Sequence, residues 1–282
     1  MKPLILMRSG GDIASGCVYR LRRAGFPVVI NELPIPTMIR RKVCYGAAVH
    51  RGEVLLERYV ARHVTLAEAK AILERGEDII PVVTEDYRTV LEALKPDVVV
   101  DAILAKRNVG TRNDDAPLVI GCGPGFTAGD DVNVVVETMR GHTLGRCIYD
   151  GSALPNTGVP GNVGGYTIER VMHSPCDGLF TARRHIGEEV EAGETIGFVD
   201  GTPVVSQIAG ILRGVLASGL MVTKGFKLAD VDARCEKSHC YSISDKALAV
   251  AGGVMEAITA FLYEESKKQT ANKAMASDID LH

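Results

Sequence analysis

Two glycine-containing turns carry the residues best suited to bind a phosphate. The first, Ser9-Gly10-Gly11-Asp12-Ile13-Ala14, lies between the apolar run Leu4–Met7 and a helical pattern. A strand, a glycine turn and a helix in this order form the context of a dinucleotide fingerprint, in which helix N–H groups face a pyrophosphate. Glu32, at the end of the next apolar run, would accept from ribose hydroxyls. Ser9 replaces the first fingerprint glycine and Asp12 adds negative charge, so a turn without a ligand stays an alternative.

The second turn runs from Gly121 to Gly129 and follows the apolar run Leu118–Ile120. Backbone amides of such a loop can form an anion nest, to which Thr127 would add a hydroxyl. Lys106 and Arg107 follow a neighbouring predicted strand and would neutralise a phosphate at the same sheet edge. A compact turn that merely needs positive φ is the alternative.

Two cysteines are candidates for sulfur or selenium chemistry. Cys122 lies inside the second glycine loop, where we expect the amides to lower the pKa of its thiol. Cys240 closes the run Cys235-Glu236-Lys237-Ser238-His239-Cys240, whose spacing is not a standard zinc pattern. We therefore assign no metal and name Cys122 and Cys240 as candidate catalytic residues, with plain structural cysteines as the alternative.

Arg140 and His142, just after the predicted strand 132–136, complete the candidate ligand-binding set. That set consists of Ser9, Gly10, Gly11, Asp12, Ile13, Glu32, Lys106, Arg107, Gly121, Gly123, Gly125, Phe126, Thr127, Arg140 and His142.

Apolar runs that alternate with helical patterns must position these residues. Strands are predicted at 4–7, 28–30, 79–83, 98–103, 118–120 and 132–136, with helices at 13–24, 64–76 and 86–94. This order predicts an α/β fold with a Rossmann-like parallel sheet over residues 1–165.

An internal repeat comes after the predicted sheet domain. Residues 174–232 repeat at an offset of 32, with Gly178, Gly187 and Gly193 matching glycines of the second copy. The repeat resembles the biotinyl/lipoyl barrel-sandwich, which we expect over 166–235. The hairpin Asp200-Gly201-Thr202-Pro203 lacks the modified lysine of carriers, so no covalent biotin or lipoate is expected. We also predict a C-terminal helix over 236–266 that packs on the body, and a disordered tail over 267–282.

Composition excludes several classes of partner. The net charge is −3, aromatics make up 5% and Trp is absent, so neither nucleic acid nor an anionic membrane is an expected partner. No uninterrupted apolar run reaches the roughly 18 residues of a membrane span. The seven cysteines form no CxxC pair, which favours free thiols in a reducing cytoplasm.

The chain up to about residue 262 resembles the selenium-dependent molybdenum hydroxylase accessory family, which is YqeB-like. The resemblance rests on short motifs in order, namely Ser9 to Gly16, Ile39-Arg40-Arg41, Leu104 to Asn108, the Gly121 to Gly129 loop, Glu137 to His142, and Ile243 to Ala247. The second loop and Arg140-Gly141-His142 also look distantly like XdhC-type maturation proteins. The resemblance implies maturation or insertion of a molybdopterin-type cofactor, with a molybdenum hydroxylase as client protein.

Two other functions stay open on the residues alone. One is an NAD-dependent oxidoreductase, because Glu32 would repel the 2′-phosphate of NADP. The other is a non-catalytic scaffold that docks a partner hydroxylase. Whether the chain catalyses a reaction or forms a homo-oligomer is not decided by the sequence.

Overall fold

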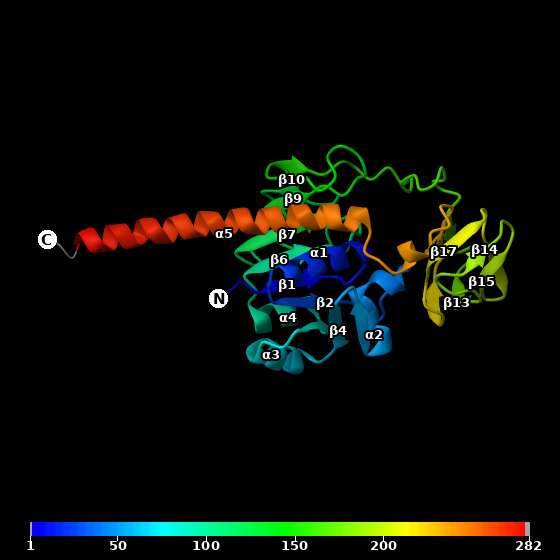
Figure 1. Ribbon diagram of the computed structural model, residues 1–282, viewed down its shortest axis with the longest axis horizontal. Helices are drawn as coiled ribbons and strands as arrows, with labels where there is room; N and C mark the ends of the chain where they lie inside the picture. The colour runs from blue at the N-terminus through cyan, green and yellow to red at the C-terminus, as the bar shows by residue number, and fades with distance from the viewer. Residues whose placement is uncertain (1, 280–282) are drawn as a thin grey trace.

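The computed structural model describes residues 2–279, with side-chain burial described up to residue 272, and contains a large sheet beside a smaller all-β unit (Figure 1). The large sheet has the strand order β10-β9-β7-β6-β1-β2-β5-β4-β3. Its strands are β1 (Ile5–Arg8), β2 (Val28–Asn31), β3 (Glu53–Leu56), β4 (Tyr59–His63), β5 (Ile79–Val83), β6 (Val98–Asp101), β7 (Leu118–Cys122), β9 (Val134–Val136) and β10 (Cys147–Ile148). A separate short pair joins β8 (Thr127–Ala128) to β11 (Gly151–Ser152).

The predicted fold class is wrong. The large sheet is mixed: β3 pairs antiparallel with β4 at one edge and β10 pairs antiparallel with β9 at the other. Only its interior is parallel, and no helix connects β6 to β7 or β7 to β9 within the described residues 102–133. The chain is therefore not a Rossmann-like parallel domain followed by a lipoyl-like barrel. The antiparallel edge was missed because Glu53–Leu56 alternates between exposed and buried residues, whereas we interpreted only continuous apolar runs as strands.

Helices cover both faces of the sheet because each interior strand is apolar on both sides. On β1, Ile5 and Met7 face α1 (Asp12–Arg23) and α5 (Asp245–Ile279), while Leu6 faces α3 (Leu66–Arg75) and α4 (Tyr87–Leu94). The ends of α1, α3 and α4 were predicted within a few residues, whereas α5 begins nine residues after the start of the expected range 236–266 and ends beyond it. Short elements follow β2, namely η1 (Arg41–Val43), η2 (Tyr45–Ala47) and α2 (Ala48–Arg51), and η3 (Lys237–Cys240) precedes α5.

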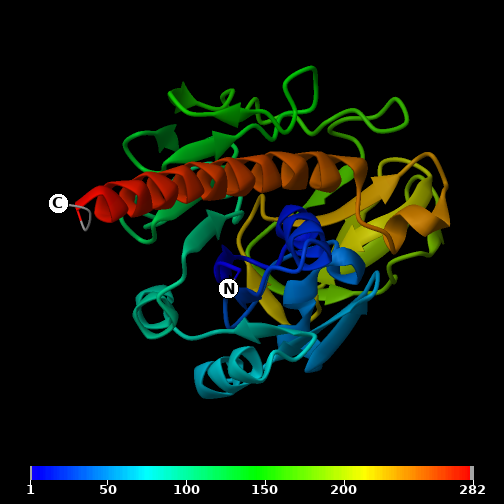
Figure 2. The ribbon, with the colours of Figure 1, turned by 60° about the vertical axis from the view of Figure 1, so that its left-hand side comes forward.

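The C-terminal helix packs on the body, as expected (Figure 2). Gly16 of α1 lies so close to α5 that an added Cβ would come within 2.7 Å of Ala247, so the two helices are in near backbone contact. Gly253 similarly packs against Gly145 and Val136. The expected disordered tail is wrong over 267–279, because α5 continues through them. Residues 280–282 lie outside the described part of the chain.

Among the described residues, one helix is long and apolar enough to cross a membrane, the segment Asp245–Asn272 of α5. Its apolar positions include Val250, Val254 and Ile258, which are fully buried against the sheet and α1. Packing inside the protein therefore accounts for this apolar stretch.

The smaller unit confirms the internal repeat. It consists of two four-stranded antiparallel sheets, β12-β19-β17-β14 and β16-β15-β13-β18, which enclose one apolar core. Its strands are β12 (Val171–His173), β13 (Gly178–Ala182), β14 (Glu189–Val190), β15 (Thr195–Val199), β16 (Thr202–Val205), β17 (Gly210–Val215), β18 (Leu220–Val222) and β19 (Lys227–Asp232). Gly178 and Gly210, which are 32 residues apart, begin equivalent strands with φ of 148° and 156°.

Arginines from the segment after β2 hold the two units together. The Ile39 carbonyl accepts from Val215 N–H (2.9 Å), and Arg41 Nε donates to the Val215 carbonyl (2.8 Å). Arg40 Nη2 donates to the His239 carbonyl (2.8 Å). These bonds place the smaller unit beside the carboxyl ends of the parallel strands.

Candidate functional site

A cavity of about 1460 Å³ lies between the large sheet and the smaller unit. The sheet contributes the residues that follow β1, β2, β5, β6 and β9, all at the carboxyl ends of parallel strands. The smaller unit contributes residues of β12, β17 and β19, and the first turn of α5 closes the cavity. Carboxyl ends of parallel strands are where ligands bind in open α/β sheets.

The first glycine loop opens onto this cavity. Ser9, Gly11, Asp12 and Ile13 line it, and Gly10 lies just behind. Ser9 adopts φ of 83° and its Oγ accepts from Gly11 N–H (3.0 Å). The first intrahelical donor of α1 is Ser15 N–H, which bonds the Gly11 carbonyl (2.8 Å). The N–H groups before Ser15 in the first turn thus point toward the cavity end of the helix.

Glu32 lines the cavity but its carboxylate holds the loop. Glu32 Oε2 accepts from Gly10 N–H (2.7 Å) and Oε1 accepts from Leu33 N–H (2.8 Å). Gly10 is required here because its carbonyl accepts from Gly46 N–H (2.9 Å), and an added Cβ would collide with the Gly46 backbone. Both oxygens that we expected to bind ribose are therefore engaged by backbone amides.

Asp12 and Arg40 form an ion pair in the middle of the site. Arg40 Nη1 lies 2.8 Å from Asp12 Oδ2, and the Arg40 side chain is only 8% exposed. Asp12 Oδ1 and Arg40 Nε are buried and have no hydrogen-bond partner among the described residues. A carboxylate at the helix N-terminus thus already neutralises one of the cavity's cations.

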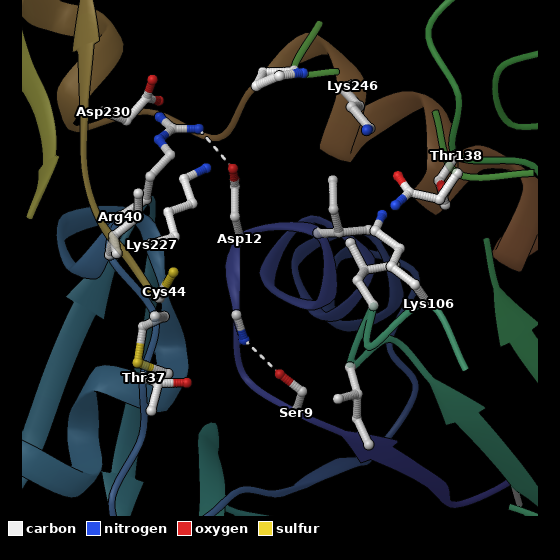
Figure 3. Close-up of a pocket in the computed structure, with 18 of the residues that line it drawn as sticks. Ser9, Asp12, Thr37, Arg40, Cys44, Lys106, Thr138, Lys227, Asp230 and Lys246 are labelled. Atoms are coloured by element: carbon white, nitrogen blue, oxygen red, sulfur yellow. Dashed lines mark hydrogen bonds and ion pairs between the residues drawn. The ribbon is translucent and has the colours of Figure 1, made fainter. Parts of the chain in front are cut away.

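Three lysines reach the cavity without such a partner. Lys106 follows β6, Lys227 begins β19, and Lys246 lies in the first turn of α5, so they come from three separate parts of the fold (Figure 3). None of the three forms an ion pair with a described residue. Burial lowers the pKa of each ammonium, and for Lys246 the neighbouring charge of Lys106 lowers the pKa further. Lys106 and Lys227 stay exposed to solvent and Lys246 is half-buried, so the desolvation of each ammonium is partial, and a bound anion would offset its cost.

Each arginine that lines the cavity forms an ion pair with an aspartate. Eight lysines and arginines and five carboxylates line the cavity, and Asp101, Asp232 and Asp245 pair with lining arginines from outside the lining. The cations are Arg8, Arg40, Lys106, Arg140, Arg170, Arg213, Lys227 and Lys246, and the carboxylates are Asp12, Glu32, Glu85, Asp86 and Asp230. The three lysines are therefore the cations of the cavity that remain available to a ligand of the opposite charge.

The second glycine loop does not form the expected anion nest. Gly123 N–H donates to the Val136 carbonyl (2.8 Å) and Gly129 N–H to the Val132 carbonyl (2.8 Å). Thr127 N–H donates to Asp131 Oδ2 (2.9 Å), and Phe126 is 4% exposed in the core. Of this loop, whose residues are all described, only Pro124 lines the cavity, so Gly121 does not reach it either. The amides of Gly123, Thr127 and Gly129 are thus used within the protein, and the glycines of the loop do not face the cavity.

The two candidate catalytic cysteines lie outside the cavity and are buried. The expectation that the loop lowers the pKa of Cys122 is wrong, because a hydrogen bond with Cys17 and burial raise the pKa of its thiol. Burial also raises the pKa of Cys240. Cys44 does line the cavity, but it is fully buried and burial raises its pKa as well.

The remaining candidates divide between the cavity and the surface. Arg140 lines the cavity, but its guanidinium bonds both oxygens of Asp245 at 2.7 Å, which raises the pKa of Arg140. Arg107 packs behind Gly125, and His142 is exposed away from the cavity. The structure therefore brings together the first loop, Glu32, Lys106 and Arg140, and separates them from the other predicted residues.

Sequence reasoning missed the wall that the smaller unit contributes. His173, Arg213, Lys227 and Asp230 all line the cavity. The repeat drew attention to glycines, and no motif marked these residues. Lys227 places a charge at the start of an apolar strand of the repeat, and this is the sequence signal that could have indicated a binding residue in the smaller unit.

No family model matches the chain. In sequence, the chain is 45% identical over 265 residues to the uncharacterized protein YqeB of Escherichia coli strain K12, a match that covers 94% of this chain and 49% of that protein. The chain is therefore similar to one part of YqeB. The chain spans about half the length of that relative.

The similar solved structures are of the aspartoacylase and succinylglutamate desuccinylase type. A product-bound ectoine utilization protein EutE from Ruegeria pomeroyi is 11% identical, with 82% of this chain and 85% of that chain covered at a TM-score of 0.25. An aspartoacylase family protein from Mesorhizobium loti is 10% identical, with 82% and 84% covered and the same TM-score. A Rhodobacter sphaeroides protein is 30% identical over 23% of this chain and 22% of its own, at a TM-score of 0.21. Likeness at this level says nothing about activity.

Proposed function

We propose that this chain binds a phosphate-bearing small molecule in the cavity and acts as an accessory protein for a selenium-dependent molybdenum hydroxylase. The observation that carries the binding proposal is the position of Lys106 and Lys246 at the first turns of α1 and α5, without an ion pair to a described residue.

The arrangement suits a phosphate for three physical reasons. The first-turn N–H groups of α1 supply donors that no helical carbonyl uses. The positive ends of two packed helices, α1 and α5, stabilise negative charge at the same place. Lys106 and Lys246 add full positive charges whose partial desolvation strengthens their attraction for an anion.

The hydroxylase part of the proposal is supported by the family likeness alone. The motifs of the first loop, Ile39 to Arg41 and Leu104 to Asn108 all contribute residues to the cavity, which fits a shared binding function. A molybdopterin-type cofactor carries a phosphate and a heterocycle, and the cavity has room for both. We assign no sulfur chemistry to Cys122 or Cys240, because both lie away from the site.

The binding proposal is tested by calorimetric titration with a molybdopterin cofactor and with nucleotides. Wild type is compared with the double variant K106A/K246A, and K70A, on the exposed face of α3, is the matched control. Loss of two charge-assisted contacts should weaken binding about 100-fold, while K70A should bind like wild type. Unchanged affinity in the double variant contradicts a site at these lysines.

The same titrations separate the two rival functions. Saturable micromolar binding of NADH with no binding of the other phosphates would favour an NAD enzyme. Capture of a partner hydroxylase that K106A/K246A leaves intact, with no small molecule bound, would favour a scaffold.

A further inference from the structure

The smaller unit places a second group of cations opposite the first glycine loop. Lys227 on β19 lies directly across from His173 on β12 in the antiparallel register. Arg213 on β17, the neighbouring strand, lines the cavity beside them. We call Lys227, His173 and Arg213 the far wall, and Lys106 with Lys246 and the first turn of α1 the near wall.

Asp230, the carboxylate next to the far wall, already forms ion pairs with two arginines. Asp230 Oδ2 accepts from Arg213 Nη2 (2.8 Å), and Asp230 Oδ1 pairs with Arg170. Asp230 is 2% exposed, so this carboxylate sits between two guanidinium groups. Lys227 forms no ion pair with a described residue, although solvent in the cavity reaches it. Burial lowers the pKa of His173, and the positive charge of Lys227 lowers it further.

The Asp12 carboxylate lies between the two walls. In the close-up, Lys227 and Arg40 lie on one side of Asp12, and Lys246 with Lys106 on the other (Figure 3). Because the Asp12 carboxylate bonds Arg40, it does not neutralise either wall fully. The cavity thus holds two groups of cations with the Asp12 carboxylate between them, and that carboxylate is paired with Arg40.

We propose that the ligand carries two separate anionic groups, one held by the near wall and one by Lys227 of the far wall. This inference rests on the proposed function and narrows the ligand to molecules such as bisphosphates whose two charges lie at different ends. A ligand of this kind bridges the sheet and the smaller unit. A monophosphate would fill only the near wall, where the helix N-termini add to the lysines.

The test compares adenosine 3′,5′-bisphosphate with adenosine 5′-monophosphate, which share a base and a sugar. Both are titrated calorimetrically into wild type, K227A and K246A, with K224A as the control for an exposed lysine of the same unit. The bisphosphate should bind wild type about tenfold more tightly than the monophosphate. K227A should abolish that difference and leave monophosphate affinity within about twofold, whereas K246A should weaken both nucleotides.

The outcomes separate this inference from the proposed function. Equal affinity of wild type for the two nucleotides overturns the two-group ligand while leaving phosphate binding intact. An equal loss of affinity for both nucleotides in K227A also overturns it, because the phosphate that the two nucleotides share would then contact Lys227. If neither nucleotide nor a molybdopterin cofactor binds wild type, the proposed function fails as well.

Discussion

The two glycine loops look alike in sequence and differ in the element that follows each of them. Each comes after a buried strand of the parallel interior and carries at least two glycines within three residues. In the first loop, Gly11 opens the N-terminal turn of α1 toward the cavity. In the second, Gly123 and Gly129 donate to strand carbonyls and Phe126 fills the core.

The next element along the chain makes this difference between the loops. A helix of 12 residues begins directly after the first loop, and the first N–H groups of a helix have no partner within it. The second loop leads instead into β8 and β9, and carbonyl groups in and before β9 accept hydrogen bonds from its glycine amides. The amides of Gly10 and Gly11 are bonded within the protein as well, so the free donors of the first loop are those of the first helical turn. A glycine-rich turn after a strand therefore indicates an anion site only when a helix begins directly after it.

The largest difference is expected in the free energy of unfolding when a methyl group is added to one loop or to the other. Gly125 has φ of 108° and an added Cβ would come within 2.6 Å of the Arg107 backbone. G125A should lower the free energy of unfolding by about 2–4 kcal/mol, through left-handed strain and overpacking. Gly11 has φ of −68° and only the Ser9 hydroxyl within 4 Å of the added carbon, so G11A should cost under about 1 kcal/mol.

Chemical denaturation measures both variants of this pair, and calorimetry measures their phosphate affinity. G11A should weaken phosphate binding several-fold, because the methyl group stands at the approach to the α1 amides. A G125A protein as stable as wild type, or a G11A protein with unchanged affinity, would remove the distinction between the loops.

A smaller effect is expected from pH. The near-wall lysines have pKa values below the ordinary 10.5, so they lose their protons before free lysine does as the pH rises. Phosphate affinity should therefore fall about tenfold as the pH approaches 10.5. Without ligand the sign reverses: the cost of these partly desolvated ammonium groups is relieved as the pH rises through their folded pKa values, which favours the folded state.

The pH effect is isolated by subtracting the titration of K106A/K246A from that of wild type, since tyrosines elsewhere also titrate. A wild-type affinity that stays constant up to the ordinary lysine pKa would show that these ammonium groups do not bind the anion.

The smallest effect is expected from Asp12, the carboxylate at the start of α1. D12N removes one negative charge from the first loop and frees Arg40, so phosphate should bind about threefold to tenfold more tightly. Isothermal titration measures the change, and D114N, at an exposed aspartate outside the cavity, serves as the control. Weaker binding in D12N would mean that Asp12 itself contacts the ligand.

The sequence predicted the local elements well and their assembly poorly. Helices such as α3 and α4 arise from periodic apolar residues, and each begins at a capping residue, Thr65 or Asp86. The edge strands β3 and β10 are short and half exposed, so their composition resembles that of loops. The predicted fold class failed because sheet pairing is decided between segments distant in the chain.

The sequence by itself determined the first loop, the helix after it and the internal repeat, because each depends on residues close together or on a fixed offset. Only the tertiary structure decided which candidates share a site. It buried Cys122 beside Cys17, turned the second loop inward, and brought Lys227 and Lys246 to opposite sides of Asp12 at the start of α1. Lys227 and Asp12 are more than 200 residues apart in sequence, so their proximity depends on packing alone.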